Sequence, residues 1–423
     1  MLTVLRPLIR HRYLLAFAFL LTFLSGHGQT YFISLFGGEI RAAFSLSNTG
    51  FGGLYSAATL TSGILVIALG RGVDRVPLPL FTAAVIVGAA AGGVLLAIAP
   101  SAAWLLPAFL LLRLCGQGLM VHVAQTTVGR RMEQGRGTAI GAITVGLPAG
   151  EAILPAVIVT LMAALGWRMS WGVFALVLVA VALPLALLLL RLAARQPSVS
   201  DAASVAAEDD TRERTNSPAG PVNDWSRAQV LRDPRFYRIM PAILAPPFLI
   251  TALFFHQVPI AEAKGWALGW LSTAFVLFAF SHVVSLTVSG MLIDRLGAAR
   301  LLRLYLAPIL AALLVLGFMP GDLAALVYLG LAGLSVGTAS TLMGAVWPEL
   351  YGIRHLGAIR AMAHGAMVLS TAIAPLLIGA LLDAGISLPV LASALAGYVV
   401  VSMLAIPGPR QLQPRDPVVR PAT

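Results

Sequence analysis

Charged residues are scarce in this sequence: they make up 11% of 423 residues, whereas soluble domains carry roughly 25%. Cys115 is the only cysteine, which excludes an internal disulfide. The sequence also lacks a glycine-rich phosphate loop followed by Lys and Ser or Thr, a Cys and His cluster with metal-ligand spacing, and a soluble segment large enough for an ATPase. These absences argue against an enzyme, and no cofactor or metal is expected.

Apolar residues are abundant instead, at 59%, and the mean hydropathy is +0.90. A hydrocarbon core about 30 Å thick needs about 20 apolar residues per helix, and about twelve such runs are present. They lie near residues 13–36, 48–70, 78–98, 103–127, 138–163, 170–191, 239–262, 268–292, 301–319, 323–346, 358–382 and 388–406. The first run is too long for a signal peptide and leads into further spans, so we expect it to be retained. The sequence predicts an all-α membrane protein that lies in the lipid bilayer.

Basic residues fix the expected orientation, because Lys and Arg near helix ends resist translocation. With the N-terminus inside, only Arg41, Arg113, Arg168 and Lys264 of the 28 Lys and Arg fall outside the inner segments. We therefore expect a multi-pass protein of the plasma or inner cell membrane with both termini in the cytoplasm. The net charge of +11 is spread over short loops and forms no single basic face, which argues against nucleic-acid binding.

The chain divides into two similar halves. We expect a six-helix bundle over 1–192, a cytoplasmic linker over 193–237, a second six-helix bundle over 238–407 and a cytoplasmic tail over 408–423. Three sets of positions recur at equal spacing in the two halves, which indicates an internal duplication. They are Gly70, Asp74 and Arg75 with Gly290, Asp294 and Arg295; Gly137 and Pro155 with Gly357 and Pro375; and Thr22 and His27 with Thr251 and His256.

These motifs resemble the major facilitator superfamily over nearly the whole chain. The two G-x-x-x-D-R loops, "RLCGQG" at 113–118 and "GAITVGLPAGEAILP" at 141–155 are similar to that family's patterns. The resemblance implies two pseudo-symmetric six-helix bundles, with Asp74, Arg75, Asp294 and Arg295 holding the inner side shut. The stretches "RRMEQGRGTAIGA" to "LGWR" and "WPELYGIRHLGAIRAMAHG" resemble the monocarboxylate and oxalate/formate anion transporters. Those monocarboxylate transporters carry a substrate-binding Arg in the eighth span, where this chain has His282.

Ionisable residues within spans are costly, so each is a candidate site residue. The candidates are His27, Arg113, His122, Glu151, His256, His282 and His364. On the first helix His27, Thr30, Tyr31 and Ser34 fall at i, i+3, i+4 and i+7, which predicts a polar stripe. The stripe either faces a cavity between the halves, which we favour, or hydrogen-bonds a neighbouring helix.

The fourth and fifth spans supply a second group of candidates. Arg113, Gly116, Gln117 and Met120 share a helical face, whereas His122 points about 180° away and is assigned a structural role. Glu151 is the expected counter-ion of Arg113. That pair is either structural or functional, with Glu151 holding Arg113 when no anion is bound or carrying a coupling proton.

The seventh and eighth spans complete the candidate site. Pro241, Pro246, Pro247 and Pro259 bend or break the seventh helix, so His256 and Gln257 are the counterparts of the motif in the first span. On the eighth span, His282 shares a face with Ser285 and Ser289. His364 lies near Arg360 and is expected at an inner gate or in a structural role.

Together these patterns predict a proton-coupled secondary transporter for a small organic anion, a carboxylate, acting as a monomer. Arg113 attracts the anion, with His27, Thr30, Tyr31, Gln117, His256, Gln257 and His282 as further binding residues. Glu151, His27 and His256 are the candidates for the proton. Two alternatives stay open. A proton-driven exporter of drugs or hydrophobic metabolites predicts an acidic, aromatic-lined cavity. A non-transporting receptor of the same fold needs a partner surface, for which only the linker is available.

Overall fold

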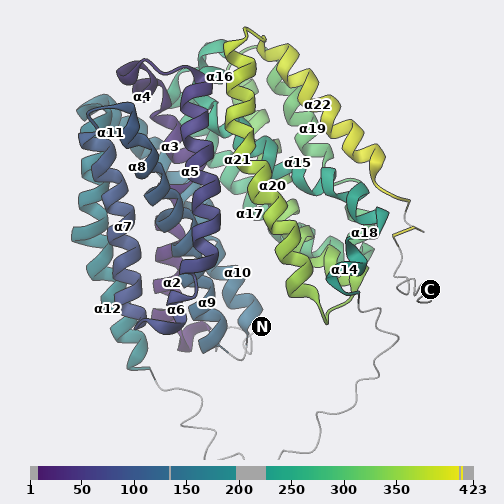
Figure 1. Ribbon diagram of the computed structural model, residues 1–423, viewed down its shortest axis with the longest axis horizontal. Helices are drawn as coiled ribbons and strands as arrows, with labels where there is room; N and C mark the ends of the chain where they lie inside the picture. The colour runs from purple at the N-terminus through teal and green to yellow at the C-terminus, as the bar shows by residue number, and fades with distance from the viewer. Residues whose placement is uncertain (1–7, 133–134, 197–224, 409–410, 413–423) are drawn as a thin grey trace, which may run out of the picture.

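The computed structural model describes residues 8–132, 135–196, 225–408 and 411–412, and helices make up nearly all of them (Figure 1). The helices of the first half are α2 (Arg12–Leu24), η1 (Ser25–Gly28), α3 (Thr30–Leu35), α4 (Gly37–Phe44), α5 (Asn48–Leu69), α6 (Gly72–Arg75), α7 (Leu78–Ile98), η2 (Ala102–Trp104), α8 (Leu105–Leu111), η3 (Leu112–Met120), α9 (Val121–Arg131), α10 (Arg136–Thr144), α11 (Gly146–Val177), η4 (Leu178–Ala182) and α12 (Leu183–Ala194). Those of the second half are α14 (Arg227–Val230), α15 (Pro234–Phe255), α16 (Gln257–Lys264), α17 (Leu268–Leu296), α18 (Ala298–Leu301), α19 (Ala307–Phe318), α20 (Leu323–Tyr351), α21 (Leu356–Asp383) and α22 (Leu388–Ala405).

The helices match the expected membrane spans. Nine helical stretches of the described chain are long and apolar enough to cross a membrane. One of them, Arg136–Ala194, is 59 residues long and reverses direction at Gly166, whose φ of +76° suits a residue without a Cβ. The remaining spans are the broken first helix, α2 to α4, and the shorter α19. The all-α fold with about twelve spans in two bundles is thus confirmed.

Each half has a break in its first long helix, at matching positions. In the first half α2 gives way to the 3₁₀ turn η1, and in the second α15 stops at His256, whose φ of −99° and ψ of 22° are not helical. Each broken helix hydrogen-bonds the fifth helix of its own half: Thr22 Oγ1 donates to the Ile143 carbonyl at 2.6 Å, and His256 Nε2 lies 3.0 Å from the Pro375 carbonyl. The repeat read from the sequence is therefore also a structural repeat.

The two halves touch at one end, called here the closed end. There α5 packs closely along α21, and a Cβ added to Gly52 would lie 2.5 Å from the Pro375 carbonyl oxygen. Asp383, at the end of α21, accepts hydrogen bonds from the backbone N–H and the side chains of Asn48 and Thr49, at 2.6–3.1 Å. The second half thereby satisfies N–H groups at the start of α5 that have no partner within their own helix.

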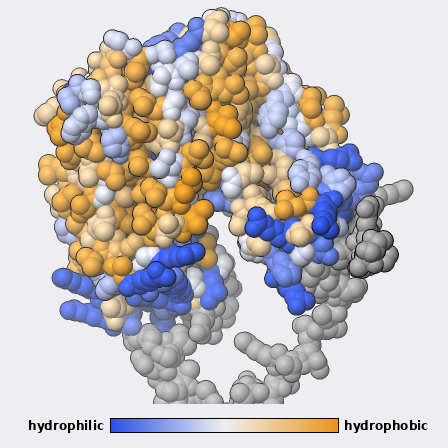
Figure 2. All heavy atoms as spheres, viewed as in Figure 1, coloured by the Kyte–Doolittle hydropathy of each residue, from blue (hydrophilic) through white to orange (hydrophobic). Residues whose placement is uncertain are grey.

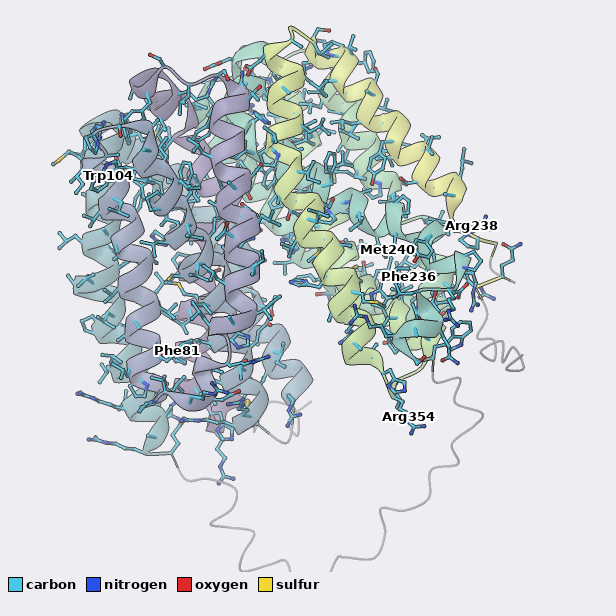
Figure 3. All side chains as sticks on the ribbon, in the orientation of Figure 1. Phe81, Trp104, Phe236, Arg238, Met240 and Arg354 are labelled. Carbon is cyan, nitrogen blue, oxygen red and sulfur yellow. The ribbon has the colours of Figure 1, made fainter. Side chains whose placement is uncertain are left out.

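At the opposite end, called here the linker end, the halves part. Figure 2 shows a hollow between them that opens downward, with hydrophilic residues on the lower ends of both halves. Arg354 lies at this end and Trp104 at the other (Figure 3). Residues 197–224 of the expected linker and most of the expected tail lie outside the described residues, whereas α14 and the start of α15 occupy 225–237.

The Asp383 contact generates a testable prediction about the closed end. Asp383→Asn removes a charge and replaces one acceptor oxygen with a donor, which costs about 0.5–1.5 kcal/mol per hydrogen bond lost. We expect the closed end to open several-fold more often. The measurement is maleimide labelling of Ser56→Cys, a buried position one turn beyond Gly52, in a Cys115→Ala background.

Asp322→Asn is the matched control, because Asp322 is an exposed acid whose side chain makes no hydrogen bond to the first half among the described residues. Labelling of Ser56→Cys at the same rate with and without the Asp383→Asn substitution would show that the contact does not hold this end shut.

Candidate functional site

The polar stripe expected on the first helix is divided by the helix break, so the i, i+3, i+4, i+7 geometry is wrong. Gln29 is extended, with ψ of 155°, which turns the residues before it away from those after it. His27 is buried within the first half, with its Nδ1 2.9 Å from the Leu24 carbonyl and its ring against Phe32 and Phe174. Thr30 Oγ1 lies 2.8 Å from the Tyr55 hydroxyl, also in the first half. The expectation that His27 faces the space between the halves is not met in this structure.

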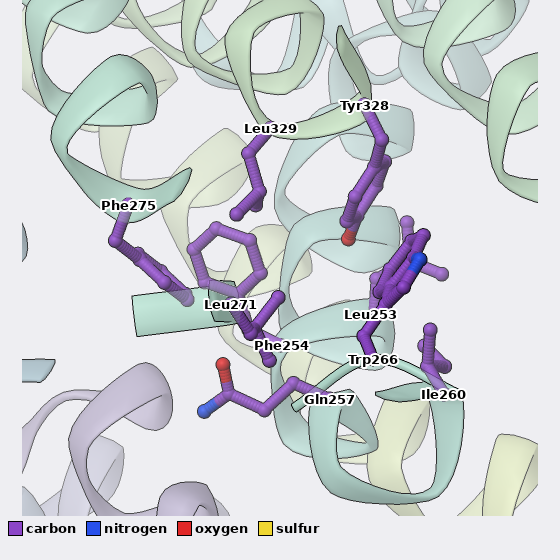
Figure 4. Close-up of a pocket in the computed structure, with 9 residues that line it drawn as sticks. All are labelled: Leu253, Phe254, Gln257, Ile260, Trp266, Leu271, Phe275, Tyr328 and Leu329. Atoms are coloured by element: carbon purple, nitrogen blue, oxygen red, sulfur yellow. The ribbon is translucent and has the colours of Figure 1, made fainter. Parts of the chain in front are cut away.

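Tyr31 and Ser34 do meet the second half. Gln257 Nε2 donates to the Tyr31 carbonyl and to Ser34 Oγ, both at 2.7 Å, and Ser34 Oγ donates to the Phe254 carbonyl at 2.6 Å. Gln257 also lines a small apolar pocket (Figure 4), and its buried amide oxygen has no protein partner. Tyr31 and Gln257 are thus brought together, at a junction that belongs to the contact between the halves.

Glu151 pairs across the halves with His282. Its Oε2 lies 3.0 Å from His282 Nδ1, and both side chains are buried, with exposed fractions of 9% and 5%. The expected pairing of Glu151 with Arg113 is therefore wrong for this conformation. Sequence spacing placed Glu151 and Arg113 in neighbouring spans, but it could not say that the eighth span crosses α11 at this level. The pair is a carboxylate and a histidine that join the two halves.

Arg113 remains without a carboxylate partner. It lies in η3, a π-helical segment, and is 5% exposed. Its Nη1 donates a long hydrogen bond of 3.4 Å to the Gly28 carbonyl, its guanidinium lies 5.0 Å from the centre of the Tyr55 ring, and its Nε has no protein partner. Among the described residues Arg113 makes no ion pair. The first helix can pass close to Arg113 because Gly28 and Gly116 approach each other closely: a Cβ on Gly116 would lie 2.9 Å from the Gly28 backbone.

The other residues of the fourth span follow the wider π-helical turn, so the face expected from 3.6 residues per turn is only approximate. Gln117 is partly exposed, whereas Met120 is fully buried in the first half. His122 Nε2 lies 3.0 Å from the Gly70 carbonyl, which agrees with its structural assignment.

In the second half, several expected site residues contact their own bundle. His256 is held by Pro375, as described, and does not contact the first half through its ring nitrogens. Ser285 and Ser289 hydrogen-bond Thr338 of α20 at 2.7 and 2.9 Å, so they do not extend the site from His282. His364 is exposed.

The loop residues expected to act as gates lie at the linker end. Asp74 forms an ion pair with Arg130 of the same half, with both side chains about half exposed. Within the described chain Arg75, Asp294 and Arg295 form no ion pair. Because the halves are apart at this end, their gating role stays a prediction. No group of three His, Cys, Asp or Glu that could hold a metal occurs among the described residues.

Sequence reasoning missed a group of aromatic residues, one of which, Tyr55, lies against the Arg113 guanidinium. Phe51 and Tyr55 on α5 and Phe109 on α8 pack together, and Phe255 of the second half lies against Phe51 and Tyr55, with ring centres 4.9 and 4.6 Å apart. The i, i+4 spacing of Phe51 and Tyr55 was the available signal, since it places both rings on one helical face. Nothing in the sequence indicated that a ring from the other half meets them.

Comparisons with known proteins agree with this architecture. The family model described as the Major Facilitator Superfamily matches residues 18–332. Among solved structures, a bacterial homolog of the human lysosomal transporter Spinster, inward-facing and unoccupied, is 15% identical with a TM-score of 0.65 and covers 95% of this chain and 94% of its own. The nucleoside transporter NupG is 14% identical with a TM-score of 0.65 and covers 93% of this chain and 98% of its own. No curated protein sequence matches the chain.

The Glu151–His282 contact predicts a specific pattern of stabilities. With His282 protonated the contact is a buried ion pair, and removing one partner of such a pair costs about 3–5 kcal/mol because the other charge is left without compensation. His282→Ala should therefore lower the thermal unfolding midpoint of the purified protein. The double variant Glu151→Ala with His282→Ala should recover part of the loss.

His122→Ala serves as the control, since it removes one hydrogen bond to a carbonyl, worth about 0.5–1.5 kcal/mol. Equal midpoints for His282→Ala and His122→Ala, with no recovery in the double variant, would mean that the pair adds nothing beyond an ordinary hydrogen bond.

Proposed function

The chain belongs to the Major Facilitator Superfamily, and from that premise we propose that it is a secondary transporter that couples protons to the movement of a small organic anion, a carboxylate. The halves would rock about their contact to expose one site to each side of the membrane in turn. The buried guanidinium of Arg113 supports this proposal most directly, because it lacks a carboxylate partner among the described residues.

The anion assignment rests on the cost of burying charge. An arginine stays charged at every accessible pH, and burying it uncompensated costs several kcal/mol. The Gly28 carbonyl and the Tyr55 ring offer partial charges only, and Nε is left free. A carboxylate supplies a full negative charge and two oxygens that match the fork of a guanidinium. A ligand of this kind would complete the site.

The proton assignment rests on the Glu151–His282 pair. In this proposal Glu151 is ionised and His282 protonated while the two side chains are in contact, and transfer or loss of one proton removes their charge attraction. The pair would then part more easily, which links the state of a proton to the separation of the two bundles. His27 and His256, by contrast, contact backbone carbonyls within their own halves, so they are weaker candidates for this role.

We place the linker end in the cytoplasm, since the basic residues gather there. The conformation described is then open to the cytoplasm, in a protein of the cell membrane that works as a monomer.

A second candidate function is proton-driven export of hydrophobic compounds. The aromatic rings around Tyr55 favour it, because such a transporter needs a cavity with apolar and aromatic walls. Arg113 is the feature that it does not explain. Transport of lipophilic cations that survives in Arg113→Ala would favour this reading.

Variants of Arg113 test the anion site. Arg113→Lys keeps the charge but loses the bidentate geometry, so the affinity for small carboxylates should fall about 10- to 100-fold, as expected for one charge-assisted hydrogen bond of about 1.5–3 kcal/mol. Arg113→Ala should abolish uptake. The measurement is uptake of labelled small acids into proteoliposomes, with protein folding checked by monodispersity.

Arg168→Lys is the matched control. Arg168 donates to the Ala99 carbonyl at 2.9 Å and stacks on Trp167, away from the contact between the halves. Carboxylate affinity that responds equally to Arg113→Lys and to Arg168→Lys would remove Arg113 from the site.

Variants of Glu151 test the coupling. Glu151→Gln keeps an oxygen that can accept from His282 but cannot bind or release a proton in the working pH range. A pH gradient should then no longer drive accumulation, while exchange of labelled for unlabelled acid continues. Glu349→Gln is the control, because Glu349 binds backbone N–H groups of Ala298 and Ala299 outside the site. Accumulation by Glu151→Gln at the wild-type level would exclude Glu151 as the proton carrier.

A further inference from the structure

Four aromatic rings pack together, namely Phe51, Tyr55, Phe109 and Phe255, and the Arg113 guanidinium lies against one of them, Tyr55. Three of them belong to the first half, and all four are buried, with exposed fractions of 2% or less. Phe255 alone comes from the second half. It lies nearly parallel to Phe51, at an interplanar angle of 24°, and tilted by 40° against Tyr55. Tyr55, whose ring lies against the Arg113 guanidinium, is thus in direct contact with the other half.

The position of Phe255 ties it to the movement of the second half. It is the last residue of α15, and the next residue, His256, is held by the Pro375 carbonyl of α21. The α21 helix in turn packs along α5 at the closed end. When α15 and α21 move away from α5 to open the closed end, Phe255 leaves Phe51 and Tyr55. The faces that Phe51 and Tyr55 turn toward Phe255 would then be free, and Tyr55 is the ring against which the Arg113 guanidinium lies.

We infer that the transported anion is a carboxylate with a flat, apolar body, an aromatic acid, and that Phe255 determines this preference. The inference rests on the proposed anion site at Arg113. In the state open at the closed end, the ligand's ring occupies the place of Phe255 against Phe51 and Tyr55, and its carboxylate binds Arg113. Aromatic rings attract one another in offset and tilted arrangements beyond the burial of their area, so an aliphatic acid of the same charge loses these contacts.

Phe255 then acts on the ligand by competition. Its contacts with Phe51 and Tyr55 re-form when the closed end shuts, so the ligand's ring must leave that place as the halves come together. A carboxylate without a ring does not compete with Phe255. The ring contacts therefore strengthen the binding of aromatic acids, and the return of Phe255 displaces them. Short aliphatic acids experience neither effect.

Equilibrium binding to the full-length protein in lipid nanodiscs tests the inference, with labelled benzoate and labelled acetate as probes. Benzoate is expected to bind roughly tenfold more tightly than acetate, from two or so ring contacts. Phe51→Leu should reduce the ratio of the benzoate affinity to the acetate affinity toward one. Phe255→Leu should change this ratio by severalfold. A change in the acetate affinity itself would report a general effect of a variant on the conformation. Phe248→Leu is the matched control, since Phe248 lies on the same helix but packs on Tyr398 within the second half.

Each outcome separates this inference from the proposed function. If neither acid binds in a manner that depends on Arg113, the anion site itself fails, and the inference with it. If both acids need Arg113 but bind equally, the anion site stands and the aromatic preference is overturned. The aromatic preference is likewise overturned if Phe248→Leu changes the ratio of benzoate to acetate affinity as much as Phe51→Leu and Phe255→Leu do. Should Phe255→Leu fail to fold, Phe51→Leu alone decides, because it removes a ring of the first half that the ligand is expected to contact.

Discussion

A carboxylate of one half and a histidine of the other meet at 3.0 Å, and both side chains are buried. In surroundings that exclude water, each of these groups would be costly alone, and together they compensate each other. The same constraint applies to Arg113, yet no carboxylate compensates it among the described residues. Asp233 and Arg235 form a buried ion pair of their own, and Glu151 lies against His282, so Arg113 is left without a carboxylate among the described residues. This imbalance is the physical reason to expect an anionic ligand beside Arg113.

Broken helices make room for these groups. In each half, the first long helix stops where a histidine sits, and the freed backbone is satisfied within the bundle, as membrane proteins require of irregular segments. Gly28 is part of the first break, and its carbonyl is the one backbone group that Arg113 contacts among the described residues. Phe255 ends the helix at the second break. Both breaks therefore deliver residues to the same region, although their histidines point into their own halves.

The sequence predicted the fold well, because its signals are local. Apolar runs of about 20 residues, basic loops and three spaced repeats depend on neighbours along the chain. The candidate site was harder to predict from the sequence. Arg113, Glu151 and His282 were identified because charge within a span is costly wherever it lies, but the partner of Glu151 depends on how α17 crosses α11, which no spacing encodes. His27 was misplaced because the stripe argument assumed an unbroken helix, and Gln29 is extended. Asp383 and Phe255 were missed since their importance comes from contacts with the other half.

The contacts between the halves differ in what can control them. Asp383 is exposed, so water competes for its hydrogen bonds with Asn48 and Thr49, and breaking them costs little. The bonds of Gln257 to Tyr31 and Ser34 are buried, but none of these groups changes its charge in the working pH range. Of these contacts, only the Glu151–His282 pair is both buried and made of two ionisable side chains. If the proposed coupling is correct, the closed end supplies a contact of nearly constant strength, and the proton shared by Glu151 and His282 decides when the halves can part.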